Sequence, residues 1–304
     1  MDKPFNSDCK VFTLSHLAVI SVTGADCGKF LQGQLTCDIN ELQDYQAGVA
    51  AFCNAKGRVI STLLVVKTGQ EYQLILPVGL LDKVLKKLQI YILRALVRLT
   101  DQSQTWRLYG LEGLAPQDQD INLQIDSSKS STDEILVIRH PAYFSHFLCI
   151  AKNPQFIEQL LQQHRYKIGS LEEWRFHELS SGFPWFEAGG SEQYIPQMLN
   201  IDQLGGISFN KGCYTGQEII ARTHYLGRAK RHLFLADCSD ITEPPACGVH
   251  VLASDNLQNV GDILSAATFL QNTRLLVVLQ GGASLKNLAL DDPRRTVIKL
   301  ADIS

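Results

Sequence analysis

The chain lacks the close cysteine spacings that mark a self-contained metal site. Its eight cysteines include no Cys-x-x-Cys pair and none lies close to a histidine at zinc-site spacing. This argues against a zinc ribbon and against a complete set of iron–sulfur ligands, so we expect no stably bound metal. Without a secretory signal, reduced thiols are expected rather than a disulfide framework. The cysteines are Cys9, Cys27, Cys37, Cys53, Cys149, Cys213, Cys238 and Cys247.

Long apolar runs and an excess of positive charge are also missing. No window approaches the roughly 18 apolar residues of a membrane span, and residues 1–6 hold neither a cationic leader nor an apolar stretch. We therefore expect a cytoplasmic protein with no membrane partner. The formal net charge of −3 argues against a globally basic nucleic-acid-binding protein. The Gly-x-Ser-x-Gly and His-Glu-x-x-His motifs of hydrolases and metalloproteases are absent.

What is present is the composition of an ordinary globular protein with mixed structure. The 304 residues are 45% hydrophobic and 19% charged, which is enough for two or three domains with substantial cores. Residues 1–225 alternate between strand-like and helix-like patterns, with turn residues at the breaks. The polar segment Gln117–Asp133 is expected to be a surface loop or weak helix. The predicted strands are Val11–Val22, Val49–Cys53, Val59–Lys67, Tyr72–Leu76, Ile135–Arg139 and Phe144–Ala151, and the predicted helices are Asp26–Leu35, Val78–Leu88, Pro154–Gln163 and Leu171–Ser181.

The pattern changes from about Leu226 onward. Short runs of alternating residues are there broken by Pro, Gly and Asn, which is typical of a small antiparallel barrel. The predicted strands are His232–Ala236, Gly248–Ala253, Val260–Ser265, Arg274–Leu279 and Thr296–Leu300.

Residues 206–218 carry the pattern most indicative of chemistry. They read Gly-Ile-Ser-Phe-Asn-Lys-Gly-Cys-Tyr-Thr-Gly-Gln-Glu. Thr215 followed three residues later by Glu218 is a capping box, in which each side chain satisfies an amide of the first helical turn. The box predicts a helix over about Gly216–Tyr225.

Cys213 lies just before this predicted helix. It would face the positive end of the helix dipole, with Lys211 two residues before it and Arg222 inside the helix. Such a setting favours the thiolate, which attacks electrophiles or binds soft metals. The alternative interpretation is a small buried side chain, because cysteines are among the most buried residues. Local patterns alone do not decide between the two interpretations.

The same stretch resembles a known family. Lys211–Glu218 looks like the diagnostic motif of the YgfZ-type proteins, which are folate-binding relatives of the glycine-cleavage T-protein, an aminomethyltransferase that uses tetrahydrofolate. The family is implicated in iron–sulfur cluster maintenance and tRNA modification. The similarity extends over most of residues 13–235, in the expected order. The supporting segments are Thr23–Asp26, Phe30–Thr36, Asn54–Arg58, Ile195–Gln197 and Leu204–Phe209.

The resemblance implies an α+β fold. Two α+β lobes of the T-protein type would surround a central cleft, and a C-terminal antiparallel β-barrel would follow. Residues 1–225 would form the folate-binding region with the cysteine motif at its end, and residues 226–304 would form the barrel. The resemblance also implies that Cys213 is the functional thiol. The residues expected to support it are Lys211, Gly212, Tyr214, Gly216, Gln217, Glu218 and Arg222.

A folate site is implied by the resemblance as well. Trp174 falls at an aromatic position associated with folate in YgfZ-type proteins, although a half-buried core aromatic is the competing interpretation. The second aromatic position falls on Leu17, and the glutamate that grips the pterin in the transferase falls on Ser180. Gln197 completes the expected set. Glu178, two residues before Ser180, is less than a helical turn away and is not expected to replace it.

One substitution separates this chain from the transferase. The transferase carries an acidic pair near its interaction with the reacting part of folate, and those positions here are Ser61 and Thr62. A hydroxyl supplies neither the charge nor the proton-accepting capacity of a carboxylate. Glu71 and Asp38 are not at the matching spacing. We therefore expect a protein that is not a classical enzyme.

Basic residues gather around and after the motif. Between Lys211 and His232, five Lys or Arg and one acid give a charge of about +4 in a chain that is negative overall. This stretch could receive a polyglutamate tail, phosphates or an RNA backbone, or be a solvated strand edge. Because aromatic residues are sparse there, direct tRNA binding is not expected. The other basic residues are Arg222, Arg228, Lys230 and Arg231, with His224 and His232 beside them.

Three functional hypotheses follow. The first is a monomeric accessory protein that uses tetrahydrofolate or a related folate and the Cys213 thiol to support iron–sulfur enzymes, such as radical enzymes that modify tRNA. The second is a tetrahydrofolate-dependent aminomethyl or methyl transferase. The third is a thiol redox protein, which requires a resolving cysteine near Cys213.

Overall fold

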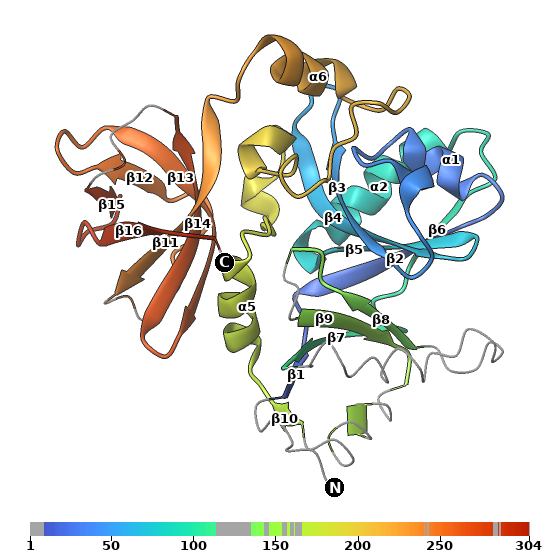
Figure 1. Ribbon diagram of the computed structural model, residues 1–304, viewed down its shortest axis with the longest axis horizontal. Coiled ribbons are helices and arrows are strands. Elements are labelled where there is room, and N and C mark those ends of the chain that lie inside the picture. Colours follow the sequence, from blue (N-terminus) through green and yellow to red (C-terminus); the bar gives the residue numbers. More distant parts are fainter. Residues whose placement is uncertain are drawn as a thin grey trace, which may run out of the picture.

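The computed structural model describes residues 9–113, 135–142, 146–153, 157, 158, 161, 166–239, 241, 243–281, 285 and 287–303. The segment Gln117–Asp133 and most of the helix expected at Pro154–Gln163 lie outside the described residues. No helix among those described is both long enough and apolar enough to span a membrane. Three parts are visible in Figure 1: two sheets that form the lobes and a barrel beside them.

The first lobe is an antiparallel sheet built on the predicted meander. Its strand order is β3 (Ala47–Cys53), β4 (Val59–Thr68), β5 (Glu71–Pro77), β2 (Leu17–Thr23) and β6 (Arg98–Asp101). Two helices, α1 (Cys27–Gln32) and α2 (Leu81–Ile92), belong to this lobe. In α2 the buried side chains Leu81, Val84 and Leu88 recur at helical spacing, as predicted. Residues Val78–Leu80, expected in the same helix, form a separate 3-10 turn.

The second lobe is a sheet whose strands come from distant parts of the chain. Its order is β10 (Lys167–Ile168), β1 (Lys10–Thr13), β7 (Arg107–Glu112), β9 (His146–Ala151) and β8 (Ile135–Arg139). The stretch Val11–Val22, predicted to form strands, is divided between the two sheets, because β1 pairs with β7 in this sheet while β2 pairs with β5 in the other.

Helix α5 (Leu171–Ser180) connects the second lobe with the barrel. Ser170 caps it by accepting a 3.2 Å hydrogen bond from the Glu173 amide. The helix contacts β1 on one side and strands β13 and β14 of the barrel on the other (Figure 1). The helix therefore lies between the second lobe and the barrel, and side chains on its two faces contact different parts of the protein.

The C-terminal part is a closed antiparallel barrel, as predicted. Its strands, in spatial order, are β11 (Arg231–Ser239), β14 (Asn272–Gln280), β13 (Asn259–Phe269), β12 (His250–Ala253), β15 (Leu288–Leu290) and β16 (Val297–Ala301). The prediction missed β15, whose three residues are too few to show an alternating pattern. An apolar core of its own fills the barrel, with Val251, Ile263 and Val277 among the fully buried side chains.

Candidate functional site

The cysteine motif lies on a loop that is bonded to the segment after α1. The Ser208 amide donates to the Thr36 carbonyl at 2.9 Å, and the Thr36 hydroxyl donates to the Gly206 carbonyl at 2.6 Å. Farther along, the Thr215 amide donates to the Gly33 carbonyl at 3.2 Å. Two of the regions that carry the family resemblance, Phe30–Thr36 and Leu204–Glu218, are thus joined in a single structure.

Lys211 anchors this loop from inside. Its ammonium group donates hydrogen bonds of 2.9 and 2.7 Å to the carbonyls of Leu35 and Cys37, and it lies 5.0 Å from the centre of the Tyr214 ring. Burial lowers the pKa of Lys211. The side chain of Lys211 is therefore directed into the protein. Its role here is to hold the loop.

The capping-box prediction is wrong, although the helix is where it was expected. Helix α6 spans Gln217–Leu226, and its N-cap is Gly216, with no side-chain capping bond. The Thr215 hydroxyl instead contacts Gln34 Oε1 at 3.2 Å. Gly216 has φ +84°, and a Cβ there would lie 2.6 Å from the Asn54 carbonyl oxygen. A close approach to the Asn54 turn therefore decides how the helix begins.

Cys213 is the exposed member of the eight cysteines, all of which lie in the described residues. Cys9 and Cys247 are half-buried and the other five are buried. Burial raises the pKa of the Cys37 thiol to about 12 and raises that of Cys53 as well. A thiol that resists ionisation is a poor nucleophile. Accessibility therefore singles out Cys213.

The remaining motif residues divide between support and solvent exposure. Tyr214 is buried, whereas Gly212, Glu218 and Arg222 are exposed and Gln217 is half-buried. Helix α6, which carries Glu218 and Arg222, lies above the ends of β3 and β4 in Figure 1.

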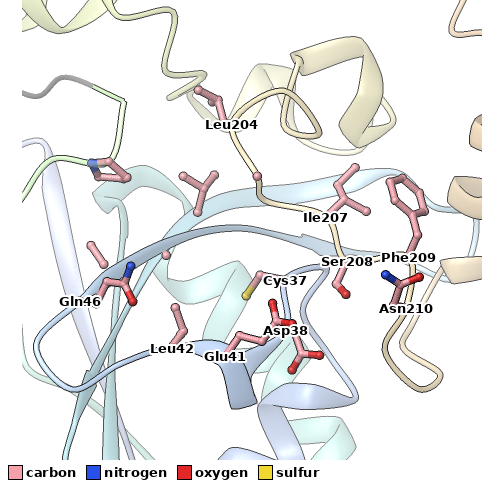
Figure 2. Close-up of a pocket in the computed structure, with 15 residues that line it drawn as sticks. Cys37, Asp38, Glu41, Leu42, Gln46, Leu204, Ile207, Ser208, Phe209 and Asn210 are labelled. Carbon is pink, nitrogen blue, oxygen red and sulfur yellow. The ribbon is translucent and has the colours of Figure 1, made fainter.

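A first cavity of about 570 Å³ lies beside the motif loop (Figure 2). The loop contributes Ser208, Phe209 and Asn210 to its wall, and the segment after α1 contributes Asp38 and Glu41. Among the described residues, the lining of this cavity holds these two carboxylates and no Lys, Arg or His side chain. It therefore disfavours an anionic ligand, because like charges repel and no cation offsets them. This cavity is therefore a poor candidate for folate.

A second cavity of about 490 Å³ lies between α5, the first lobe and the barrel. Its apolar wall includes the aromatic side chains Phe183, Trp185 and Phe186. Its polar groups include Glu178 from α5 and His16 from the turn before β2. Flat apolar walls with a few fixed polar groups are the usual features of a site for a planar ligand.

Glu178 is the buried charge of this second cavity. Its Oε1 accepts a 3.0 Å hydrogen bond from the Trp185 indole and lies 3.5 Å from His140 Nε2. Its Oε2 lies 3.7 Å from His16 Nε2. Burial alone would raise the pKa of Glu178, but the imidazoles of His140 and His16 outweigh that effect and hold the pKa well below its usual range. The cavity therefore contains a carboxylate anion at neutral pH.

Comparisons with known proteins show the family of this chain. The chain is 30% identical over 263 residues to the tRNA-modifying protein YgfZ of Colwellia psychrerythraea, covering 83% of this chain and 79% of that protein. It is 32% identical over 266 residues to the YgfZ of an Escherichia coli O157:H7 strain, covering 84% and 80%. The chain belongs to the YgfZ family. In addition, residues 4–134 match the family model of the GCVT N-terminal domain.

The fold of this YgfZ-family chain is that of the glycine-cleavage T-protein. A solved structure of the aminomethyltransferase T from Bartonella henselae is similar with a TM-score of 0.75, covering 97% of this chain and 85% of that one. The sequence identity is 13%, so the likeness shows the fold alone. The two lobes and the barrel expected from the resemblance are confirmed.

The residues that the resemblance predicts to bind folate do not line the second cavity of this YgfZ-family protein. They are Trp174, Leu17, Ser180 and Gln197. Trp174 is completely buried against Phe12, with ring centres 5.3 Å apart, and Gly110 leaves the room that its ring needs. Leu17 is buried in the core. The neighbouring His16 and the later Trp185 are the ones that reach the cavity.

Ser180 and Gln197 have structural partners instead. Ser180 Oγ donates to the Phe176 carbonyl and accepts a short hydrogen bond from Arg274. Gln197 is buried and donates a 2.7 Å hydrogen bond to the Ile220 carbonyl of α6. Glu178, two residues before Ser180, lies in the wall of the second cavity. The feature of the sequence that could have indicated the second cavity was the aromatic run Phe183–Phe186 after α5.

Ser61 and Thr62, the residues expected at the acidic positions of the transferase, form hydrogen bonds inside the protein. Ser61 Oγ donates to the Thr62 carbonyl, and Thr62 Oγ1 donates to the Pro184 carbonyl, each at 2.8 Å. Both residues are fully buried. In this member of the YgfZ family these positions therefore support the core near the aromatic run.

Two members of the predicted basic cluster are engaged within the protein. Lys211 is buried, and Arg231 forms a 2.8 Å ion pair with Asp262 of the barrel. Arg222, Arg228 and Lys230 stay exposed. The charge available to a polyanion is therefore smaller than the sequence indicated.

Proposed function

We propose that this protein is a folate-binding accessory protein that supports iron–sulfur enzymes, including enzymes that modify tRNA, through the thiol of Cys213. The observation that carries the proposal is the exposure of Cys213 on a loop held by buried hydrogen bonds. A thiol in this position can reach a partner without the protein unfolding. The relatives are named as tRNA-modifying proteins, which supports a function in tRNA modification.

The second cavity supports the folate part of the proposal. Phe183, Trp185 and Phe186 offer flat apolar walls for a pterin, and Glu178 offers a carboxylate to its N–H donors. Arg175, which also lines this cavity, would meet the negative charge of a glutamate tail. When bound, a reduced folate supplies one-carbon chemistry.

The buried Glu178 also bears on the alternative of a one-carbon transferase. A general base works best when its pKa is close to the working pH. The His16 and His140 imidazoles hold the pKa of Glu178 below its usual range, so this carboxylate is suited to gripping a ligand rather than to accepting a proton. The accessory function is therefore the better supported of the two.

The buried thiols weigh against a thiol redox protein. A resolving cysteine has to form a disulfide bond with the attacking cysteine, so its sulfur must be able to reach that thiol. Cys37 and Cys53 are buried, and burial raises the pKa of each thiol. The proposed role of Cys213 is consequently toward another protein or ligand.

The test compares wild type with Cys213→Ser in cells that lack the chromosomal copy. Nucleosides of bulk tRNA are quantified by mass spectrometry, and the activity of an iron–sulfur enzyme is measured in the same extracts. The proposal expects Cys213→Ser to behave like the deletion while the purified variant keeps wild-type thermal stability. Full complementation by Cys213→Ser would refute it.

Folate binding is tested separately. Tetrahydrofolate is titrated anaerobically into wild type and into Glu178→Gln in a calorimeter. Saturable one-to-one binding that the substitution weakens is expected. Absence of binding at millimolar ligand would remove folate from the proposal and leave the role of Cys213 standing.

A further inference from the structure

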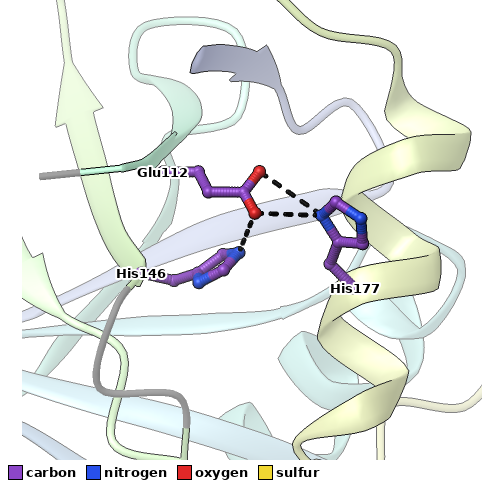
Figure 3. Close-up of side chains that lie close together, drawn as sticks. All are labelled: Glu112, His146 and His177. Atoms are coloured by element: carbon purple, nitrogen blue, oxygen red, sulfur yellow. Dashed lines mark hydrogen bonds and ion pairs between the residues drawn. The ribbon is translucent and has the colours of Figure 1, made fainter. Parts of the chain in front are cut away.

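Three potential metal ligands, distant in sequence, meet on the second lobe. Glu112 ends β7 and is paired directly with His146, the first residue of β9, so both side chains leave the sheet on one face. His177 comes down onto that face from α5. Figure 3 shows the three side chains directed toward one another. No other such group of three His, Cys, Asp or Glu occurs in the part of the chain that the structure describes.

The distances between the ligand atoms suit a small metal ion. Glu112 Oε1 lies 3.5 Å from His146 Nε2 and 3.1 Å from His177 Nδ1. One ligand atom from each residue lies within 4.8 Å of the other two. Bonds of about 2.0–2.2 Å arranged tetrahedrally place ligand atoms about 3.3–3.6 Å apart. The two separations measured from Glu112 are therefore already close to those of a bound ion.

We propose that Glu112, His146 and His177 form a binding site for a divalent transition-metal ion of the zinc or iron(II) class. Two imidazoles and one carboxylate are the donor set that such ions prefer, whereas magnesium and calcium prefer oxygen ligands alone. Three protein ligands leave at least one coordination position for water or another ligand. The site goes beyond the proposed function, because none of its residues lines the second cavity or belongs to the motif loop.

The surroundings favour binding over simple exposure to solvent. His146 is buried, with its ring 5.0 Å from that of Trp174, while the His177 ring lies 6.1 Å from that of Phe269 in the barrel. Glu112 and His177 keep 22% and 27% of their side chains exposed, which leaves a path for the ion. Aromatic walls lower the local dielectric and strengthen the attraction between the ion and the carboxylate.

A histidine–carboxylate pair elsewhere in the protein provides the matched control. His250 Nδ1 lies 2.7 Å from Asp262 Oδ1 on the barrel, and among the described residues this pair belongs to no group of three potential ligands. If Glu112, His146 and His177 were only an ion-pair cluster, they would behave toward metals like this pair. His177→Gln and His250→Gln therefore remove comparable side chains from the two places.

The experiment titrates metal-free, full-length protein with Zn²⁺ against a chromophoric chelator, and with Fe²⁺ anaerobically. We expect one equivalent to bind to wild type and to His250→Gln. Outer-shell changes at metal sites already cost about 10–100-fold in affinity, so loss of a ligand in His177→Gln or Glu112→Gln should weaken binding by about 100-fold. Binding should also raise the melting temperature of wild type but not of His177→Gln.

Cys213→Ser separates this site from metal capture by the exposed thiol, since thiolates also bind zinc. Unchanged affinity in Cys213→Ser together with weakened affinity in His177→Gln supports the proposal. Equal affinity in wild type and His177→Gln, or no saturable binding to wild type, overturns it. His177 is partly exposed, so its replacement is not expected to unfold the protein, and circular dichroism verifies this.

Discussion

The indole Nε1 of Trp185 donates a 3.0 Å hydrogen bond to Oε1 of Glu178, and both side chains line the second cavity. The bond fixes the carboxylate against an aromatic wall. A carboxylate has about four lone-pair positions, so acceptor capacity remains for a ligand. This arrangement joins a flat surface and a fixed negative charge in one wall.

Replacing Glu178 by Gln is expected to weaken tetrahydrofolate binding. The amide keeps the shape and an acceptor but removes the charge, and a hydrogen bond to a charged group contributes about 1.5–3 kcal/mol, or about 10–100-fold in affinity. Calorimetry measures the change. Glu173→Gln is the control, because Glu173 lies on the same helix but bonds to Lys10. Equal affinity in wild type and Glu178→Gln would contradict the prediction.

Stability should depend on pH through the same carboxylate. The folded state holds the pKa of Glu178 below its unfolded value of about 4.3, so its contribution is complete above that value and is lost as the pH falls toward the folded pKa. Urea unfolding of wild type between pH 3 and 7 should show decreasing stability below about pH 4.3. Glu178→Gln should decrease less steeply. Parallel curves for the two proteins would count against the assignment.

Lys211→Met should destabilise the protein by about 2–4 kcal/mol. The substitution leaves the Leu35 and Cys37 carbonyls without their donor, and each unsatisfied buried acceptor costs about 1–3 kcal/mol. Urea unfolding measures the loss. Lys230→Met, at an exposed position, should change stability by less than about 0.5 kcal/mol. A Lys211→Met protein as stable as wild type would show that the buried ammonium is not an anchor.

Gly216→Ala should be damaging where Gly212→Ala is not. At Gly216 the backbone has φ +84° and an added Cβ would meet the Asn54 carbonyl oxygen at 2.6 Å, whereas nothing lies within 4 Å of a Cβ at Gly212. Strain of this kind costs about 1–3 kcal/mol. Thermal unfolding of the two variants tests the contrast. Similar melting temperatures for both would mean that the Asn54 turn yields easily.

Cys213 should be the first thiol to react in the folded protein. It is exposed, while the other cysteines are buried or half-buried. Brief treatment with iodoacetamide followed by peptide mass spectrometry should find the label at Cys213, and unfolding in urea should open all eight sites. Faster labelling at the half-buried Cys247 or Cys9 would contradict the prediction.

Local patterns in the sequence were enough to predict most elements of the fold. Strand-like runs separated by turn residues predicted β3, β4 and β5, and helical spacing of apolar residues predicted α2, because each pattern depends only on neighbouring residues. The predicted start of α6, Gly216, differs by one residue from the observed start, Gln217. The strand β15 was missed because three residues carry no period. The division of β1 and β2 between two sheets depends on distant pairing partners, which no local pattern contains.

The sequence by itself determined the position of the family motif around Cys213, because its residues are contiguous in the chain. It did not determine what the neighbours of Cys213 do. The hydrogen-bond partners of Lys211 and Thr215 lie between 174 and 181 positions earlier in the sequence. These contacts therefore form only when the chain folds. Tertiary structure likewise brought Glu178 into the cavity and joined Glu112, His146 and His177. A motif is a property of adjacent residues, whereas a pocket or ligand set depends on distances through space.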